Sequence, residues 1–367
     1  MDHEPNHFGT AVRYLPKSKT FQSESYRKPQ LKNGEILVKI SLCTICGSDL
    51  HTYSGRRPTA DTGCVLGHEI IGTIEEWNGT DSPKDYFGNP LNKGQRVTWS
   101  LVASCGDCFY CKDNLPQKCQ SKFKYGHDES NHQPTGGLGQ HCVLKSGTAI
   151  FPIKEGLPDT LMCPANCATA TVCGATRLVE ETHPIKNTTT LVIGAGMLGL
   201  TAAAYLKERG ANILVVEPNL ERRKIAREFG ASECFESCQT ESLQTKIQEL
   251  TQHRGADIAF DFSGNTEAIT SSLEHLRIGG CLLLAGSVFR SPQIKLNPEV
   301  VVRQMLTIRG LHNYHAQDLA EAIHFLSHSK DTYPFEKLVS KVFPLDQSAL
   351  AFDYATEKAP IRIAVKP

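Results

Sequence analysis

The chain has 367 residues, of which 40% are hydrophobic and 21% charged, a composition typical of a folded protein with more than one hydrophobic core. Its 39 Lys and Arg residues balance 39 Asp and Glu residues, which gives a formal net charge of +0. This balance argues against general binding to nucleic acid or to anionic membranes, although it leaves room for a local basic pocket.

The opening stretch MDHEPNHFGT is polar and lacks the charged and apolar regions of a secretory signal. The most membrane-like run, LVIGAGMLGLTAAAYL at 191–206, is shorter than the roughly 20 residues that a span requires, and three glycines interrupt it. We therefore expect a cytoplasmic protein without membrane association. Its 14 cysteines should be reduced and available for metal binding or catalysis.

The first part of the chain contains short β-like runs that Gly, Pro, Asn and Asp separate, at 34–42, 69–77, 95–102 and 141–147. This pattern predicts an irregular, mostly β domain.

The middle of the chain has a different pattern. Apolar strands are predicted at 189–196, 212–217, 256–264 and 279–287. Helical patterns lie between them at 197–209, 219–230 and 265–276. Alternation of this kind predicts an α/β domain whose parallel sheet is covered on both faces. Beyond residue 310 we predict one helix near 317–328 and a strand at 361–366, a tail that could rejoin the first domain.

A glycine-rich turn follows the first of these apolar strands. Gly194-Ala195-Gly196-Met197-Leu198-Gly199 fits G-x-G-x-x-G, and a predicted helix follows it. The first glycine would make the turn, the second would let the backbone approach a pyrophosphate, and the third would allow close helix–strand packing. Gly194, Gly196, Met197, Leu198 and Gly199 are therefore candidate cofactor-binding residues. The alternative is a packing turn in another kind of α/β protein.

Glu217 ends the next predicted strand, at the distance expected for a ribose-binding carboxylate. It can accept hydrogen bonds from ribose hydroxyls and would repel a 2′-phosphate, which favours NAD over NADP. Arg222 and Arg223 complicate this choice, because either could reach an adenosine phosphate or simply lie on a solvated helix face.

Four cysteines follow the pattern C-x2-C-x2-C-x7-C, namely Cys105, Cys108, Cys111 and Cys119. Four thiolates can surround one Zn²⁺ tetrahedrally and leave no open position, which is the signature of a structural site. Disulfides or unconnected core cysteines are the alternatives.

A second metal site is predicted from scattered ligands. Cys46, His68 and one further cysteine would form a Cys-His-Cys set that leaves a fourth position open, as a catalytic zinc requires. Spacing alone does not choose the third ligand among Cys163, Cys167 and Cys173.

The motifs CGSDLH at 46–51, GHE at 67–69, the four-cysteine segment and GAGMLG at 194–199 occur in the order typical of one family. The sequence resembles the zinc-containing medium-chain alcohol dehydrogenases over nearly its whole length. The resemblance implies a split, GroES-like catalytic domain of residues 1–162 and 310–367. It also implies a Rossmann dinucleotide-binding domain, doubly wound, of residues 163–309.

The resemblance also implies roles for single residues. It selects Cys167 in NCATAT as the third ligand of the catalytic zinc, with Glu69 as a neighbour that can approach the metal. Asp49 would support His68. Ser48 would hold the substrate hydroxyl, and His51 would pass its proton to water. Thr171 would lie near the nicotinamide.

Positive charge near the expected cleft bears on the substrate. Arg57 occupies a position that is apolar in simple alcohol dehydrogenases, and Lys124 is a candidate to join it. An arginine fork matches phosphate-like oxygens, so the expected substrate is a small anionic alcohol or aldehyde. Segments such as FKYGH resemble the branch proposed to accompany phosphonate catabolism, which implies a phosphonate-bearing substrate. Alternatively, Arg56 and Arg57 are solvated loop residues.

These observations predict an NAD-dependent oxidoreductase with two zinc ions per chain, one catalytic and one structural. A homodimer or homotetramer is expected from the resemblance alone. One alternative is a dehydrogenase for uncharged polyols or simple alcohols. Another, from a different class, is a catalytically silent dinucleotide-binding protein on the same fold.

Overall fold

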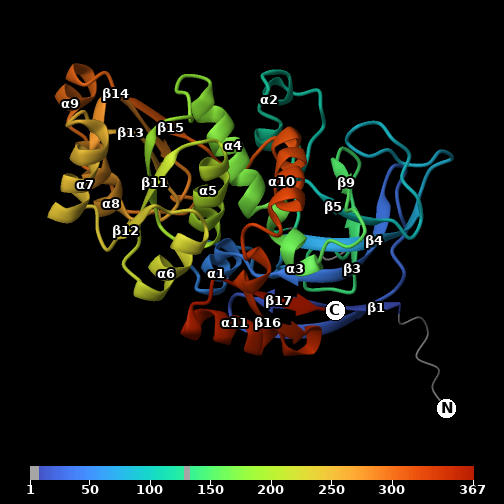
Figure 1. The fold of residues 1–367 in the computed structure, drawn as a ribbon. Helices are drawn as coiled ribbons and strands as arrows, with labels where there is room; N and C mark the ends of the chain where they lie inside the picture. The colour runs from blue at the N-terminus through green and yellow to red at the C-terminus, as the bar shows by residue number, and fades with distance from the viewer. Residues whose placement is uncertain (1–7, 128–132) are drawn as a thin grey trace, which may run out of the picture. The chain divides into compact units, whose positions relative to one another are not determined.

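The computed structural model describes residues 8–127 and 133–367 (Figure 1). Residues 1–7, which form most of the stretch considered for a secretory signal, lie outside the described residues. The chain divides into two compact units. The first comprises residues 1–167, 315–330 and 335–367, and the second comprises residues 168–314 and 331–334. The divisions at 167 and 314 each lie five residues beyond the boundaries expected at 162 and 309.

The first unit is mostly β, as predicted. Its seven-stranded sheet has the order β16-β17-β3-β4-β5-β9, and β8 pairs with β3. The strands are β3 (Ile36–Thr44), β4 (Glu69–Trp77), β5 (Arg96–Trp99), β8 (His141–Leu144), β9 (Ile150–Pro152), β16 (Val339–Pro344) and β17 (Arg362–Lys366). Two small antiparallel pairs accompany it, β1 (Gly9–Leu15) with β2 (Thr20–Tyr26) and β6 (Val102–Ala103) with β7 (Phe123–Lys124).

Among its described residues, this unit has the α-helices α1 (Gly47–Tyr53), α2 (Phe109–Lys112), α3 (Asp159–Met162), α10 (Ala316–Ser329) and α11 (Ser348–Lys358). The prediction of a single helix in the tail was wrong, because α11 and the strand β16 also form there. Phe352 and Ala351 of α11 are fully buried in a core cluster with Val365 of β17. This packing, rather than a strong amphipathic pattern, stabilises α11.

The second unit contains the predicted parallel sheet, in the order β12-β11-β10-β13-β14-β15. Its strands are β10 (Thr189–Ile193), β11 (Asn212–Val216), β12 (Glu233–Phe235), β13 (Ala256–Asp261), β14 (Leu276–Leu284) and β15 (Thr307–Gly310). Strand order reverses at β10, so its carboxyl end lies at the topological switch point, where open α/β sheets bind ligands.

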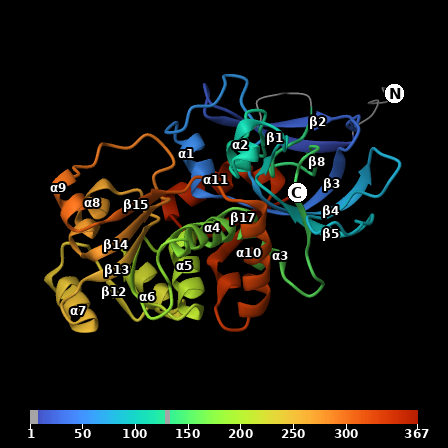
Figure 2. The same ribbon diagram turned by 90° about the horizontal axis from the view of Figure 1, so that it is seen from above.

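Helices cover both faces of this sheet (Figure 2). They are α4 (Ala168–Glu180), α5 (Met197–Glu208), α6 (Leu220–Glu228), α7 (Glu241–Thr251), α8 (Thr266–Glu274) and α9 (Pro298–Arg303). Leu191 and Ile193 of β10 share a core cluster with Leu243 of α7 and Ile269 of α8. Helices α4 and α5 contact each other and lie on the other face. The expected doubly wound Rossmann architecture is confirmed. Within the described residues, no helix combines the length and apolar character that crossing a membrane requires.

Candidate active site

The first part of the candidate site lies between the end of β3 and the start of α1. Cys46 precedes the helix, and its backbone N–H donates to Asp49 Oδ2 at 2.9 Å. The same carboxylate accepts the Gly67 N–H at 3.2 Å through Oδ1. Asp49 thus joins the start of α1 to the segment that enters β4, and its side chain is completely buried.

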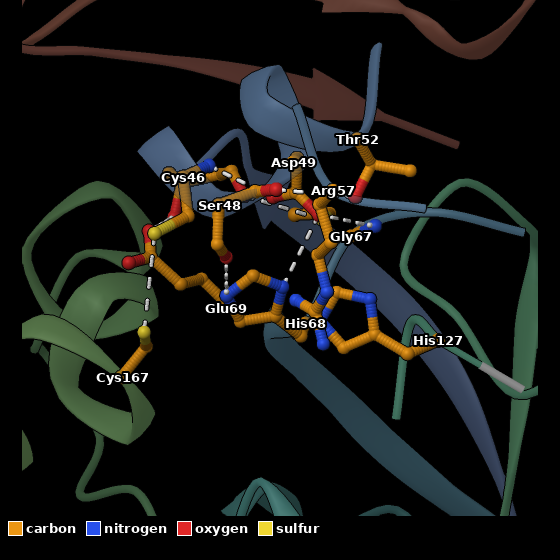
Figure 3. Close-up of polar contacts among 12 residues, drawn as sticks. Cys46, Ser48, Asp49, Thr52, Arg57, Gly67, His68, Glu69, His127 and Cys167 are labelled. Carbon is orange, nitrogen blue, oxygen red and sulfur yellow. Dashed lines mark hydrogen bonds and ion pairs between the residues drawn. The ribbon is translucent and has the colours of Figure 1, made fainter. Parts of the chain in front are cut away.

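His68 is oriented by this carboxylate (Figure 3). Its Nδ1 lies 3.2 Å from Asp49 Oδ1, so the ring donates there and Nε2 is left facing Ser48 Oγ at 3.3 Å. Burial lowers the pKa of His68, but the Asp49 carboxylate and the Cys46 sulfur outweigh it and raise this pKa to about 10. Metal binding through Nε2 must therefore displace a proton.

Cys167 completes a three-ligand group. Its Sγ lies 3.9 Å from Cys46 Sγ, and the candidate ligand atoms of Cys46, His68 and Cys167 all lie within 4.8 Å of one another. Zinc–sulfur bonds of about 2.3 Å at tetrahedral angles separate two sulfurs by about 3.8 Å, so the donor set and its spacing fit zinc. Cys163 instead donates to the Glu69 carbonyl at 3.0 Å, and Cys173 is buried in α4 of the other unit.

Glu69 is held by an arginine that the sequence analysis did not single out. Arg362 of β17 donates from Nε and Nη2 to the two carboxylate oxygens, each at 3.0 Å, and Thr44 Oγ1 adds a bond of 2.6 Å. The Arg362 guanidinium also lies 3.5 Å from Cys46 Sγ. The Cys167 thiol, Arg362 and His68 together lower the pKa of Cys46 well below its usual value. The thiolate that a metal requires is thus favoured.

A cluster of cations lies beside these ligands. Arg57, half-buried, donates from Nη1 to His127 Nε2 at 3.0 Å, and the His127 ring lies 5.2 Å from that of His68 (Figure 3). Burial, together with the charge of Arg57, lowers the pKa of Lys124 to about 8. Arg56, by contrast, is exposed. Burial and the nearby Arg56 lower the pKa of His51, which lies on α1.

The four predicted cysteines of the second site come together in a lobe around α2. Sulfur–sulfur distances are 3.4 Å for Cys105–Cys119, 3.5 Å for Cys108–Cys111 and 3.9 Å for Cys108–Cys119. These values match the spacing around one tetrahedral zinc. Backbone N–H groups of Gln120 and Cys111 lower the pKa of Cys108 to about 6, which favours a thiolate ligand.

In the second unit, the glycine-rich turn has the geometry that its sequence predicts. A Cβ at Gly199 would lie 1.7 Å from the Gly194 carbonyl oxygen, so only glycine allows α5 to pack here. Gly194 has φ +96°. A Cβ at Gly196 would meet no described atom within 4 Å, which leaves the backbone open to a ligand. Met197 and Leu198 begin α5.

A groove of about 530 Å³ lies beside this turn, lined by Gly194, Gly196, Glu217 and Arg222 among others. Glu217 Oε2 accepts the Ala195 N–H at 2.8 Å, and Oε1 accepts the Asn219 N–H at 2.9 Å. Arg223 donates to the carbonyl oxygens of Glu217 and Pro218 at 2.7 Å each, so its guanidinium is bonded to the neighbouring backbone. Thr171 lies half-buried on α4 of the same unit.

Comparisons with known proteins agree with this architecture. Residues 32–155 match the family model of the alcohol dehydrogenase GroES-like domain, and residues 198–328 match that of the zinc-binding dehydrogenases. Together these models cover about two thirds of the chain. The chain belongs to the zinc-type medium-chain alcohol dehydrogenase family and is an oxidoreductase of that class.

The D-arabitol-phosphate dehydrogenase of Enterococcus avium is 26% identical over 342 residues, which are 92% of this chain and 91% of that protein. The sorbitol dehydrogenase of Bacillus subtilis is 26% identical over 360 residues, 96% of this chain and 95% of that protein. The crystal structure of an alcohol dehydrogenase from Thermotoga maritima matches with a TM-score of 0.91 and 25% identity, over 98% of this chain and 99% of that one.

Proposed function

We propose that this protein is a zinc- and NAD-dependent dehydrogenase that converts small alcohols bearing an anionic group, a phosphonate among them, to the corresponding carbonyl compounds. Cys46, His68 and Cys167 would hold the catalytic zinc, and Cys105, Cys108, Cys111 and Cys119 the structural zinc. The observation that carries the proposal is the Cys46–His68–Cys167 group, with ligand atoms within 4.8 Å of one another. A cytoplasmic homodimer or homotetramer belongs to the same proposal.

The zinc would supply Lewis acidity toward the substrate oxygen, and the nicotinamide would accept a hydride. Asp49 keeps the His68 ring in the tautomer that offers Nε2. Ser48, whose hydroxyl lies beside that nitrogen, would hold the substrate hydroxyl and take its proton. His51, with its lowered pKa, would remain neutral near pH 7 and pass a proton to water. Thr171 would contact the nicotinamide ring.

The distribution of charge supports the proposed substrate class. Two Cys thiolates would balance the charge of a zinc dication, and Glu69 is paired with Arg362, so the positive charges of Arg57 and Lys124 are only partly offset. Burial and the nearby charge of Arg57 lower the pKa of Lys124 to about 8, although the sulfurs of Cys167 and Cys46 and the Asp49 carboxylate act in the opposite direction; the lowered pKa expresses the cost of burying one cation close to another. A phosphoryl, phosphonate or similar head group would remove this cost. The Enterococcus avium relative is named for a phosphorylated polyol, which supports an anionic alcohol.

Uncharged polyols are the second candidate, because other relatives are named as a sorbitol dehydrogenase and as a D-arabinitol dehydrogenase. The two are separated by comparing kcat/KM for 2-hydroxyethylphosphonate and a pentitol phosphate with values for sorbitol and ethanol. We expect the anionic alcohols to be preferred. The assay follows nicotinamide absorbance with NAD and NADP in turn.

Arg57→Ala should reduce kcat/KM for the anionic alcohol by about 100-fold, since hydrogen bonds to charged groups contribute about 1.5–3 kcal/mol each. The value for an uncharged alcohol should stay within about twofold. Arg56→Ala is the matched control, because its exposed side chain carries the same charge one residue away. Equal losses for charged and uncharged substrates in Arg57→Ala would contradict the substrate assignment.

Cofactor preference should depend on Glu217. Its carboxylate is fixed by two backbone N–H groups at the edge of the groove, where it would face a 2′-phosphate. Glu217→Gln removes the negative charge but retains a hydrogen-bond acceptor. Because the side chain then no longer repels the 2′-phosphate of NADP, the ratio of kcat/KM with NAD to kcat/KM with NADP should fall about tenfold. Glu267→Gln, an exposed carboxylate of the same groove, is the control. An unchanged ratio in Glu217→Gln would exclude this role.

A further inference from the structure

His127 contacts both the candidate metal site and the cation cluster. Its ring lies 5.2 Å from the His68 ring, at an interplanar angle of 34°. Its Nε2 lies 3.0 Å from Arg57 Nη1 (Figure 3). Arginine has only donors, so His127 Nε2 must accept this bond and its ring proton must be on Nδ1.

The backbone around His127 is closely fitted to the segment that carries His68 and leads into β4. Gly126 has φ +70°, and a Cβ on it would lie 2.4 Å from the Gly67 carbonyl oxygen. Its N–H donates to the Thr135 carbonyl at 3.0 Å. Tyr125, the residue before it, is completely buried. These contacts fix the place of His127 relative to the metal-ligating segment.

Arg57 is held at two points. Its backbone N–H donates to the His51 carbonyl at 3.0 Å, which closes the turn after α1. Its guanidinium is held by His127, which comes from a segment 70 residues away in sequence. A guanidinium held in one orientation loses less conformational entropy when it binds an anion, so its affinity for that anion rises.

Lys124 adds a second cation from the same segment. It lies on β7, three residues before His127, and its charge interacts with Arg57 and with the sulfurs of Cys46 and Cys167. We infer that His127 is a positioning residue that orients Arg57, so that Arg57 and Lys124 together bind a doubly charged tetrahedral head group, a phosphoryl or phosphonate group, beside the candidate zinc. This inference rests on the proposed function.

The test compares His127→Ala with His127→Gln, whose amide oxygen can still accept from Arg57. His127→Ala should raise KM for 2-hydroxyethylphosphonate about tenfold and leave kcat within twofold. The kcat/KM for an uncharged alcohol should not change. His127→Gln should restore most of the affinity. A role confined to folding or zinc retention would instead reduce kcat for both substrates and lower the zinc content, measured by elemental analysis.

A second measurement does not depend on turnover. Calorimetric titration of the zinc-loaded protein with methylphosphonate should give an affinity that falls about tenfold in His127→Ala and recovers in His127→Gln. Binding that is equal in all three proteins, or absent from the unsubstituted one, overturns the inference. Absence of turnover with every alcohol, alongside His127-dependent methylphosphonate binding, would contradict the proposed function instead and support the anion site.

Discussion

Cys167→Ser should lower the zinc content from two ions per chain to one and reduce dehydrogenase activity by about 10³-fold or more. The magnitude follows because stabilisation of a substrate oxygen by the metal is worth several kcal/mol, and each 1.36 kcal/mol is a factor of ten. Cys167 contributes one of only two sulfurs in the group, 3.9 Å from Cys46 Sγ. A serine hydroxyl is a much poorer zinc ligand than a thiolate.

Cys163→Ser provides the matched control. This cysteine lies four residues earlier, is completely buried, and donates to backbone carbonyl oxygens that a serine hydroxyl can also reach. It should retain two zinc ions and most of the activity. Elemental analysis of the zinc content of both variants tests whether Cys167 is a ligand. Two zinc ions per chain in Cys167→Ser would exclude Cys167 as a ligand.

Cys111→Ser should remove the other zinc ion and open the lobe between Cys105 and Cys119 to proteolysis, with cleavage there at least ~10-fold faster. The lobe has little else to hold it, since α2 has no buried residue and Phe109 is 67% exposed. Structural zinc sites supply folding energy directly, so a lobe without a core of its own should open when the metal leaves.

Cys234→Ser, a half-buried cysteine outside both groups, should change neither zinc content nor cleavage. Mass spectrometry of the fragments from limited digestion locates the cut. The two zinc-losing variants are then distinguishable. Cys167→Ser should lose activity while the lobe stays resistant to protease, whereas Cys111→Ser should open the lobe to cleavage. Retention of two zinc ions and of protease resistance in Cys111→Ser would contradict a structural metal site.

Much of this architecture could be predicted because its signals are local. The glycine-rich turn needs glycine at position 199, because a Cβ there would lie only 1.7 Å from the Gly194 carbonyl oxygen, so the sequence motif predicts the backbone geometry directly. The four cysteines lie within fifteen residues of sequence, and their clustering follows from short loops. Apolar strands with clear boundaries, such as β4, were also predicted closely.

The remaining features depend on contacts that spacing does not encode. Arg362 occurs in the alternating strand IRIAVK and looks like an outward-facing residue, yet its guanidinium is buried against Glu69. The choice among Cys163, Cys167 and Cys173 depends on the short 3₁₀ turn at Cys163–Asn166, which shifts the phase of the segment before α4 begins. The strand β2 was missed because TFQSESY is polar and resembles a loop.

The Glu69–Arg362 pair has a consequence for how the chain matures during translation. Its two members are 293 residues apart, and β17, which carries the arginine, inserts between β16 and β3. The ribosome therefore releases β3, β4 and all of residues 168–314 before the partner of Glu69 exists. The second unit can fold while the seven-stranded sheet of the first unit still lacks β16 and β17. Until β17 is synthesised, the Glu69 carboxylate near Cys46 has no arginine to balance its charge. The three candidate zinc ligands are thus made early, whereas the arginine that neutralises Glu69 beside them is among the last residues of the first unit to be synthesised.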